Sequence, residues 1–136
     1  YSGIYLYAGG CHPLGDGLRR HSSLERKIFS EARVQSPERT VHDIRSSFPY
    51  MMLRGFDGEN DWYKEQLLGE MAYDKEMIRT IRTYIKLNRN ASMAAKQLYV
   101  HRNSLQYRID KFIEKTGLDI RNFYDAMIAY LAITIL

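Results

Sequence analysis

The chain has 136 residues with a formal net charge of +4 at pH 7, and 45% of them are hydrophobic. This composition is that of a folded chain with room for one core or two small lobes, and no apolar run reaches the ~20 residues of a membrane helix. A single cysteine, Cys11, excludes an internal disulfide and agrees with a reducing cytoplasm, the location that we expect. No signal peptide is visible and the first residue is Tyr1, so we expect a piece of a longer polypeptide.

The first third of the chain predicts a short strand and a helix. Residues 1–10 alternate weakly and are rich in Tyr, Ile and Leu, which predicts a strand that ends at Gly10 and takes its partners from upstream sequence. A helix over 18–34 follows, and Pro37 ends it. Its apolar positions are Leu24, Ile28 and Ala32.

Three short elements are expected between residues 40 and 73. They are a strand over 40–44, a helix over 49–54 and a helix over 62–71. The apolar members of the strand are Val41 and Ile44. In the first helix, Ser46 or Ser47 is the expected cap and Pro49 lies in the first turn. In the second helix, Asp61 is the expected cap, and the core residues are Trp62, Leu67, Leu68 and Met71.

A longer helix is predicted over 75–88. Asp74 is a suitable N-cap because its side chain can accept from a free N–H of the first turn. Isoleucines recur on one side of this helix, so we expect that side to face inward. They are Ile78, Ile81 and Ile85, flanked by Met77 and Tyr84.

Residues 90–111 read as two short helices joined by a tight turn. Ser92 is the expected cap of the first helix, and its small apolar face, which includes Ala94, Ala95 and Leu98, lets a second helix cross closely. Val100 fills the turn. The second helix is expected over about 102–115, with one side packed inward by Leu105, Ile109 and Phe112.

The outward residues of this helix pair are chemically suited to a DNA groove. Arg pairs bidentately with guanine, Asn or Gln with adenine, and hydroxyls reach phosphates. An ordinary amphipathic helix with a solvated polar face is the alternative. The candidate DNA-binding residues are Ser92, Lys96, His101, Arg102, Asn103, Ser104, Gln106, Tyr107, Arg108 and Lys111. The expected base readers are Arg102, Asn103, Gln106 and Arg108, and the expected phosphate contacts are Lys96, Tyr107 and Lys111, while His101 either contacts phosphate or caps and packs.

The charge distribution favours the DNA-binding interpretation. Residues 75–115 hold ten Lys or Arg and three Asp or Glu, a local charge of +7 within a chain of +4. The positive charge is therefore concentrated on the segment with the two-helix pattern, as in a nucleic-acid binder.

The chain ends in a helix that is apolar nearly all round. Gly117 predicts the stop of the preceding helix, and Asn122 with Asp125 predicts the start of the last one. Because one helix-turn-helix reads only a half-site, we expect a homodimer. The last helix is one candidate surface for it, with core packing over the preceding helices as the alternative. The candidate residues are Phe123, Met127, Tyr130, Leu131 and Ile135.

Residues 100–109, Val-His-Arg-Asn-Ser-Leu-Gln-Tyr-Arg-Ile, and residues 116–119, Thr-Gly-Leu-Asp, resemble the C-terminal helix-turn-helix domain of PucR/CdaR-class bacterial transcriptional regulators. The resemblance runs from near Ala72 to the end and implies a sequence-specific, Fis-like DNA-binding domain behind an upstream sensory region. Tyr99 departs from the common helix-turn-helix pattern, which often has Gly in the turn.

The resemblance also implies the domain organisation. It assigns 1–45 to the tail of a degenerate GGDEF-like regulatory domain, 46–73 to a helical connector and 74–136 to the DNA-binding domain. The expected fold class is mainly α, a Fis-like helix-turn-helix bundle preceded by a small α/β remnant.

No other motif predicts chemistry. Cys11 and His12 have no second Cys at ligand spacing and no acid-base partner placed by the sequence, so a loop cysteine is the expected reading, with no metal, cofactor or enzyme activity. No GG(D/E)EF signature is present. Two classes of function stay open: a regulator that binds double-stranded DNA, and a helix-turn-helix module for protein interaction or dimerisation without DNA contact.

Overall fold

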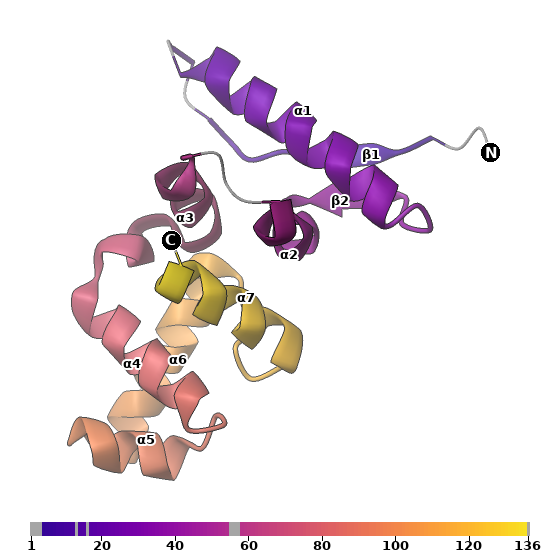
Figure 1. Cartoon of the computed structure of the whole chain (residues 1–136). Helices are drawn as coiled ribbons and strands as arrows, with labels where there is room; N and C mark the ends of the chain where they lie inside the picture. Colours follow the sequence, from indigo (N-terminus) through magenta and orange to yellow (C-terminus); the bar gives the residue numbers. More distant parts are fainter. Residues whose placement is uncertain (1–3, 13, 16, 55–57, 136) are drawn as a thin grey trace. The chain divides into compact units, whose positions relative to one another are not determined.

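The computed structural model describes residues 4–12, 14, 15, 17–54 and 58–135, which form two compact units, Tyr1–Gly58 and Glu59–Leu136. Figure 1 shows their elements, which are mainly helices, with one small two-stranded sheet among the described residues. The expected fold class is therefore confirmed. The predicted connector over 46–73 is divided between the two units.

The small sheet belongs to the N-terminal unit. Strand β1 (Leu6–Ala8) pairs in parallel with β2 (Val41–Asp43), and α1 (Leu18–Gln35) is the crossover between them. Strand β1 thus has a downstream partner that the sequence did not predict, and a further partner from upstream sequence stays a prediction. Residues 1–3 of the predicted strand lie outside the described part.

The residue of β2 that faces the core is His42, not an aliphatic neighbour. Val41 is 51% exposed and His42 only 1%. The His42 ring lies against Phe29 of α1, with ring centroids 5.9 Å apart. Because side chains alternate along a strand, the face that α1 covers receives His42 and leaves Val41 outside. Of the two apolar residues predicted for this strand, Val41 belongs to β2, whereas Ile44 is already the first residue of α2.

Helix α2 (Ile44–Arg54) begins earlier than predicted. The Ser46 N–H donates to Asp43 Oδ1 over 2.8 Å, and the Asp43 N–H donates to Ser46 Oγ over 3.1 Å. This reciprocal pair starts the helix directly after β2, so Asp43 holds the cap position predicted for Ser46 or Ser47. Pro49 consequently lies inside the helix, where it removes one backbone donor.

The C-terminal unit starts with α3 (Asn60–Leu68) and the 3-10 helix η1 (Gly69–Tyr73). The predicted single helix over 62–71 is broken at Gly69, whose φ of 53° interrupts the α-helix. Asp61 lies in the first turn of α3 rather than at its cap, which is Glu59. The predicted core residues Trp62, Leu67, Leu68 and Met71 are all buried.

Helix α4 (Lys75–Lys86) has the predicted cap but a rotated buried face. The Met77 N–H donates to Asp74 Oδ1 over 2.9 Å. The helix packs against η1, α5, α6 and α7. These neighbours leave Ile78 and Ile85 only half-buried. The fully buried face comprises Met77, Thr80, Ile81 and Tyr84.

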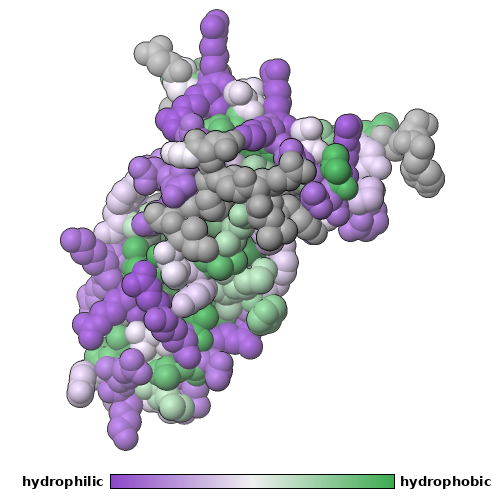
Figure 2. All heavy atoms as spheres, viewed as in Figure 1, coloured by the Kyte–Doolittle hydropathy of each residue, from purple (hydrophilic) through white to green (hydrophobic). Residues whose placement is uncertain are grey.

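The last helix, α7 (Phe123–Ile135), packs against α3 and α4. The Asp125 N–H donates to Asn122 Oδ1 over 2.9 Å, as the sequence predicted for its start. At its other end, the Arg82 guanidinium donates to the Ile133 carbonyl, which satisfies an end-of-helix acceptor. In Figure 2 hydrophobic residues, in green, gather over α7. No helix in the described part has the length and apolar character to cross a membrane.

Helix α5 (Ala91–Leu98) is capped by Asn90, and the prediction of Ser92 as its cap was wrong. The Met93 N–H donates to Asn90 Oδ1 over 3.1 Å, while Ser92 lies exposed in the first turn. Both residue types cap well, so the choice depends on which residue has extended backbone angles, and Asn90 has them.

We expect Asn90→Ala to lower the free energy of unfolding by about 1 kcal/mol, because it leaves an N–H of α5 without its acceptor. Ser92→Ala, two residues away, is the matched control and should change stability by less than about 0.5 kcal/mol. Chemical denaturation of both variants measures the difference. Equal losses in the two variants would contradict the assignment of the cap.

Candidate nucleic-acid interface

Helices α5 and α6 (Arg102–Thr116) form a helix-turn-helix around a left-handed residue. Tyr99 has φ 57° and ψ 40° and is 93% exposed. The Val100 N–H donates to the Ala95 carbonyl over 3.0 Å, which closes the end of α5. Ala94 and Ala95 are buried, and their small size allows α6 to pack close to α5.

The inward side of α6 is the predicted one. Leu105, Ile109 and Phe112 are almost completely buried, and α6 packs against α4 and α5. The helix ends at Gly117, whose φ of 69° is the predicted left-handed stop. Burial of these three side chains fixes which side of α6 remains available to a ligand.

His101 caps the recognition helix α6. The Asn103 N–H donates to His101 Nδ1 over 3.2 Å. Of the two roles left open for His101, capping is therefore the one that the structure contains. Because Nδ1 accepts this hydrogen bond, the hydrogen of the neutral ring is on Nε2. The ring is exposed, so Nε2 is accessible to a ligand. A phosphate contact from Nε2 stays a prediction.

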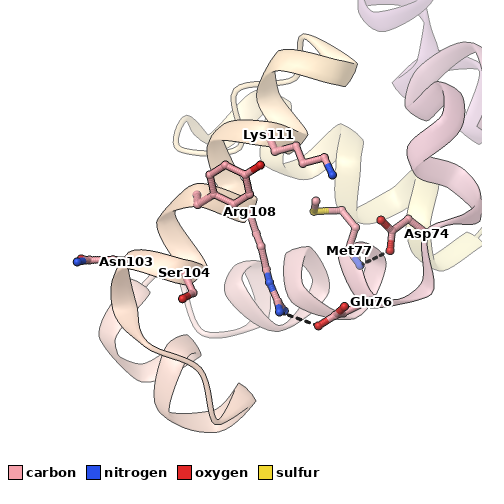
Figure 3. A pocket seen from close by; sticks show the side chains of 8 residues that line it. Asp74, Glu76, Met77, Asn103, Ser104, Arg108 and Lys111 are labelled. Atoms are coloured by element: carbon pink, nitrogen blue, oxygen red, sulfur yellow. Dashed lines mark hydrogen bonds and ion pairs between the residues drawn. The ribbon is translucent and has the colours of Figure 1, made fainter.

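Most of the predicted DNA-binding residues lie in the first two turns of α6 or on α5, and they are exposed. Figure 3 shows the Asn103 side chain directed away from α4. Gln106 Nε2 donates to Asp110 Oδ1 over 3.1 Å, which orients the amide one turn before the carboxylate. The exposed members are Ser92, Lys96, His101, Arg102, Asn103, Ser104, Gln106 and Tyr107.

An open groove of about 560 Å³ runs between the start of α4 and the side of α6 (Figure 3). Lys111, which is half-buried, lies in this groove together with carboxylates of α4. The lining is thus of mixed charge. The residues that line it are Asp74, Glu76, Met77, Asn103, Ser104, Tyr107, Arg108 and Lys111.

Arg108 differs from the other candidates because its side chain lies against α4. Arg108 Nη2 is 2.7 Å from Glu76 Oε1, and Nη1 donates to Thr80 Oγ1 over 3.2 Å. Its side chain is 26% exposed. Nothing in the sequence pattern predicted Glu76 and Thr80 as its partners. The available signal was the position of Arg108, directly before the buried Ile109 and thus at the edge of the inward side.

The second half of α6 is less basic than the first. Exposed acids Asp110 and Glu114 lie there, and Lys115 Nζ pairs with Glu70 Oε1 over 3.0 Å. Beyond the helix, the Arg121 guanidinium donates to the Asp119 carboxylate and thereby holds the pKa of Asp119 below its usual range. The positive charge of α6 is therefore concentrated in its first half.

No group of three or more His, Cys, Asp and Glu side chains suited to a metal ion occurs among the described residues. His12 instead contacts Glu25, with Nε2 and Oε1 3.2 Å apart, and Cys11 is exposed in its loop.

Comparison with known proteins agrees with this geometry. Residues 77–135 match the family described as the PucR C-terminal helix-turn-helix domain. This part of the chain is a PucR-type helix-turn-helix domain. It contains α5, α6, α7 and almost all of α4, so the resemblance noted from the sequence is confirmed for this domain.

The chain is also similar to longer curated proteins. It is 37% identical over 136 residues to the uncharacterized protein YxkF of Bacillus subtilis, covering 96% of this chain and 44% of that protein. It is 34% identical over 79 residues to the carbohydrate diacid regulator of Escherichia coli, covering 54% and 20%. It is 38% identical over 48 residues to the proline-responsive transcriptional activator PutR of Bacillus subtilis, covering 35% and 12%.

The chain spans less than half the length of each of these relatives. No solved structure matches it. The GGDEF-like origin of residues 1–45 stays a prediction.

The turn of the PucR-type domain offers a test of backbone strain. Tyr99→Gly should raise the free energy of unfolding by about 1 kcal/mol, because Gly adopts the left-handed conformation without a Cβ clash and the exposed ring contributes little packing. Tyr107→Gly, an exposed position inside α6, is the control and should lower it by about 0.5 kcal/mol. Thermal unfolding measures both. A loss of stability in Tyr99→Gly would show that the tyrosine ring stabilises the turn.

Proposed function

We propose that this chain is the DNA-binding part of a transcriptional regulator and that the first half of α6 enters the major groove of double-stranded DNA. One observation carries this proposal. Arg102, Asn103 and Gln106 are exposed in the first two turns of a helix whose other side is buried against α4 and α5. The regulators among the relatives support it, since PucR-type domains occur in the carbohydrate diacid regulator and PutR.

The residue types of this face suit base recognition. Arg102 can pair bidentately with guanine, and Asn103 or Gln106 with adenine. The hydrogen bond from Gln106 to Asp110 uses one amide hydrogen and leaves the second hydrogen and Oε1 for the base.

The phosphate contacts are proposed around this face. The donors are polar side chains of α5 and α6 and of the residue that caps α6, and the positive end of each helix adds a favourable field for phosphate near its start. The proposed phosphate-contacting residues are Ser92, Lys96, His101, Ser104, Tyr107 and Lys111.

The acids of α6 limit how far along the helix DNA lies. Asp110 and Glu114 are exposed in its second half, where they offset the charge of Lys111 and weaken the attraction for phosphate. We therefore place the base contacts in residues 102–106 alone, as in helix-turn-helix proteins that read bases with the start of the recognition helix.

A homodimer is proposed because one such domain reads a half-site. Helix α7 offers one surface: Phe123 is 71% exposed and lies with Met127 and Tyr130 along a groove beside α4. The side chain of Ile135, also predicted there, lies outside the described part. Effector sensing is proposed to reside in an upstream domain of the full-length, cytoplasmic protein.

The first experiment is selection of bound sequences from a random duplex DNA pool, with affinity measured at 50 and 200 mM salt. A protein that neutralises about four phosphates loses affinity by about 100-fold over this range. We expect an enriched motif, arranged as an inverted repeat if the chain dimerises.

Arg102→Ala and Gln106→Ala should relax the motif at one base position each, at about 1–3 kcal/mol per lost contact. Arg26→Ala removes the same charge from an exposed site outside the PucR-type domain and is the control. Unchanged affinity and sequence preference in Arg102→Ala would contradict the proposed readout. Binding to no DNA at either salt concentration would favour the protein-interaction module instead.

A further inference from the structure

Arg108 is the one predicted base reader that the fold directs to another helix. The two terminal nitrogens of its guanidinium both have partners on α4: Nη2 contacts the Glu76 carboxylate at 2.7 Å, and Nη1 donates to the Thr80 hydroxyl at 3.2 Å. Figure 3 shows the Arg108 side chain extended toward Glu76, while Asn103 is directed away. A bidentate contact with guanine needs the guanidinium fork to be directed at the base edge, whereas here the fork is directed at α4.

Thr80 is arranged to hold this contact. Its side chain is completely buried, and its hydroxyl donates to the Glu76 backbone carbonyl over 2.8 Å. The hydroxyl proton is thus committed within α4, and the oxygen lone pairs face Arg108. A buried acceptor oriented in this way contributes more than an exposed ion pair such as one to Glu76 alone, because water does not compete for it.

From this geometry we propose that Arg108 does not read a base but is a positioning residue for DNA recognition. Together with Glu76 and Thr80 it forms a clasp, defined by these three residues, that sets the rotation and tilt of α6 on α4. The inference rests on the proposed function, since what the clasp positions is the base-reading start of α6.

The clasp is needed because the packing of α6 on α4 and α5 is otherwise mainly apolar. Leu105, Ile109 and Phe112 bury one side of the helix, and such contacts are non-directional. Arg108 lies between Leu105 and Ile109 in the sequence, and its side chain contacts the first two turns of α4. It therefore holds one side of α6 against α4 through directional hydrogen bonds. Small rotations of α6 would move the ends of Arg102 and Gln106 relative to base edges, which sequence discrimination cannot tolerate.

The test uses variants of the whole chain. For each variant we measure the affinity for the selected motif and for a scrambled duplex, and compare the ratio of the two affinities. Arg108→Lys keeps the charge but loses the planar fork of donors. Glu76→Gln removes the negative charge of one partner, and Thr80→Val removes the hydroxyl of the other at equal size. Each should lower the ratio by about threefold to tenfold, as expected for partly exposed charged hydrogen bonds. Thr80→Ser retains the hydroxyl and should restore the ratio to that of the unmodified chain.

Two comparisons separate positioning from direct readout. Glu114→Gln removes an equal charge from an exposed site of α6 and should leave the ratio unchanged. In the double variant Glu76→Gln/Arg108→Lys the ratio should fall no further than in Arg108→Lys alone, because both act through one contact. Measurement at a temperature where circular dichroism shows every variant folded excludes a simple loss of folded protein.

The outcomes are distinct. If Glu76→Gln tightens binding to the motif beyond Glu114→Gln and raises the ratio, Arg108 is being released to read DNA and the inference is overturned. Additive losses in the double variant overturn it as well. An unmodified chain that selects no motif would overturn the proposed function itself, whereas a selected motif with an unaffected ratio in the clasp variants overturns the positioning role alone.

Discussion

The burial of one side of α6 against α4 and α5 is the constraint on which the rest of the domain depends. Leu105, Ile109 and Phe112 lose nearly all contact with water, and each such burial contributes about 1.5–3 kcal/mol. The small residues Ala94 and Ala95 make this burial possible, because larger side chains would hold α5 and α6 apart. Because this side of α6 is buried, the opposite, polar side faces outward.

Polar contacts then divide α6 into two halves with different roles. Its start is capped by His101 and carries exposed Arg and Asn, whereas its second half carries Asp110 and Glu114 and ends near the Lys115–Glu70 pair. The total charge of the segment suggests a uniform basic surface, but the pairing of individual charges concentrates DNA-competent groups at one end. A helix-turn-helix that reads bases with the start of its second helix needs this arrangement.

Elements whose signals are local could be predicted from the sequence. The caps at Asp74 and Asn122, the stop at Gly117 and the inward side of α6 depend on residues within one or two turns of each other. Where two local signals compete, prediction failed. Asn90 and Ser92 both suit a cap, and Asp43 precedes Ser46 by three residues, so backbone geometry decided both cases.

By itself, then, the sequence determined the helix-turn-helix, the extent of α6 and the side of α6 that is buried, because helical periodicity depends on neighbouring residues. Only the tertiary structure decided which polar residues of α6 remain available. Arg108 belongs to the polar set by type, yet it pairs with Glu76 and Thr80, which lie about thirty residues earlier in the chain. Likewise, His42 is buried because α1 covers its face of the sheet. A contact between residues so far apart depends on the packing of whole helices, and no local pattern encodes it.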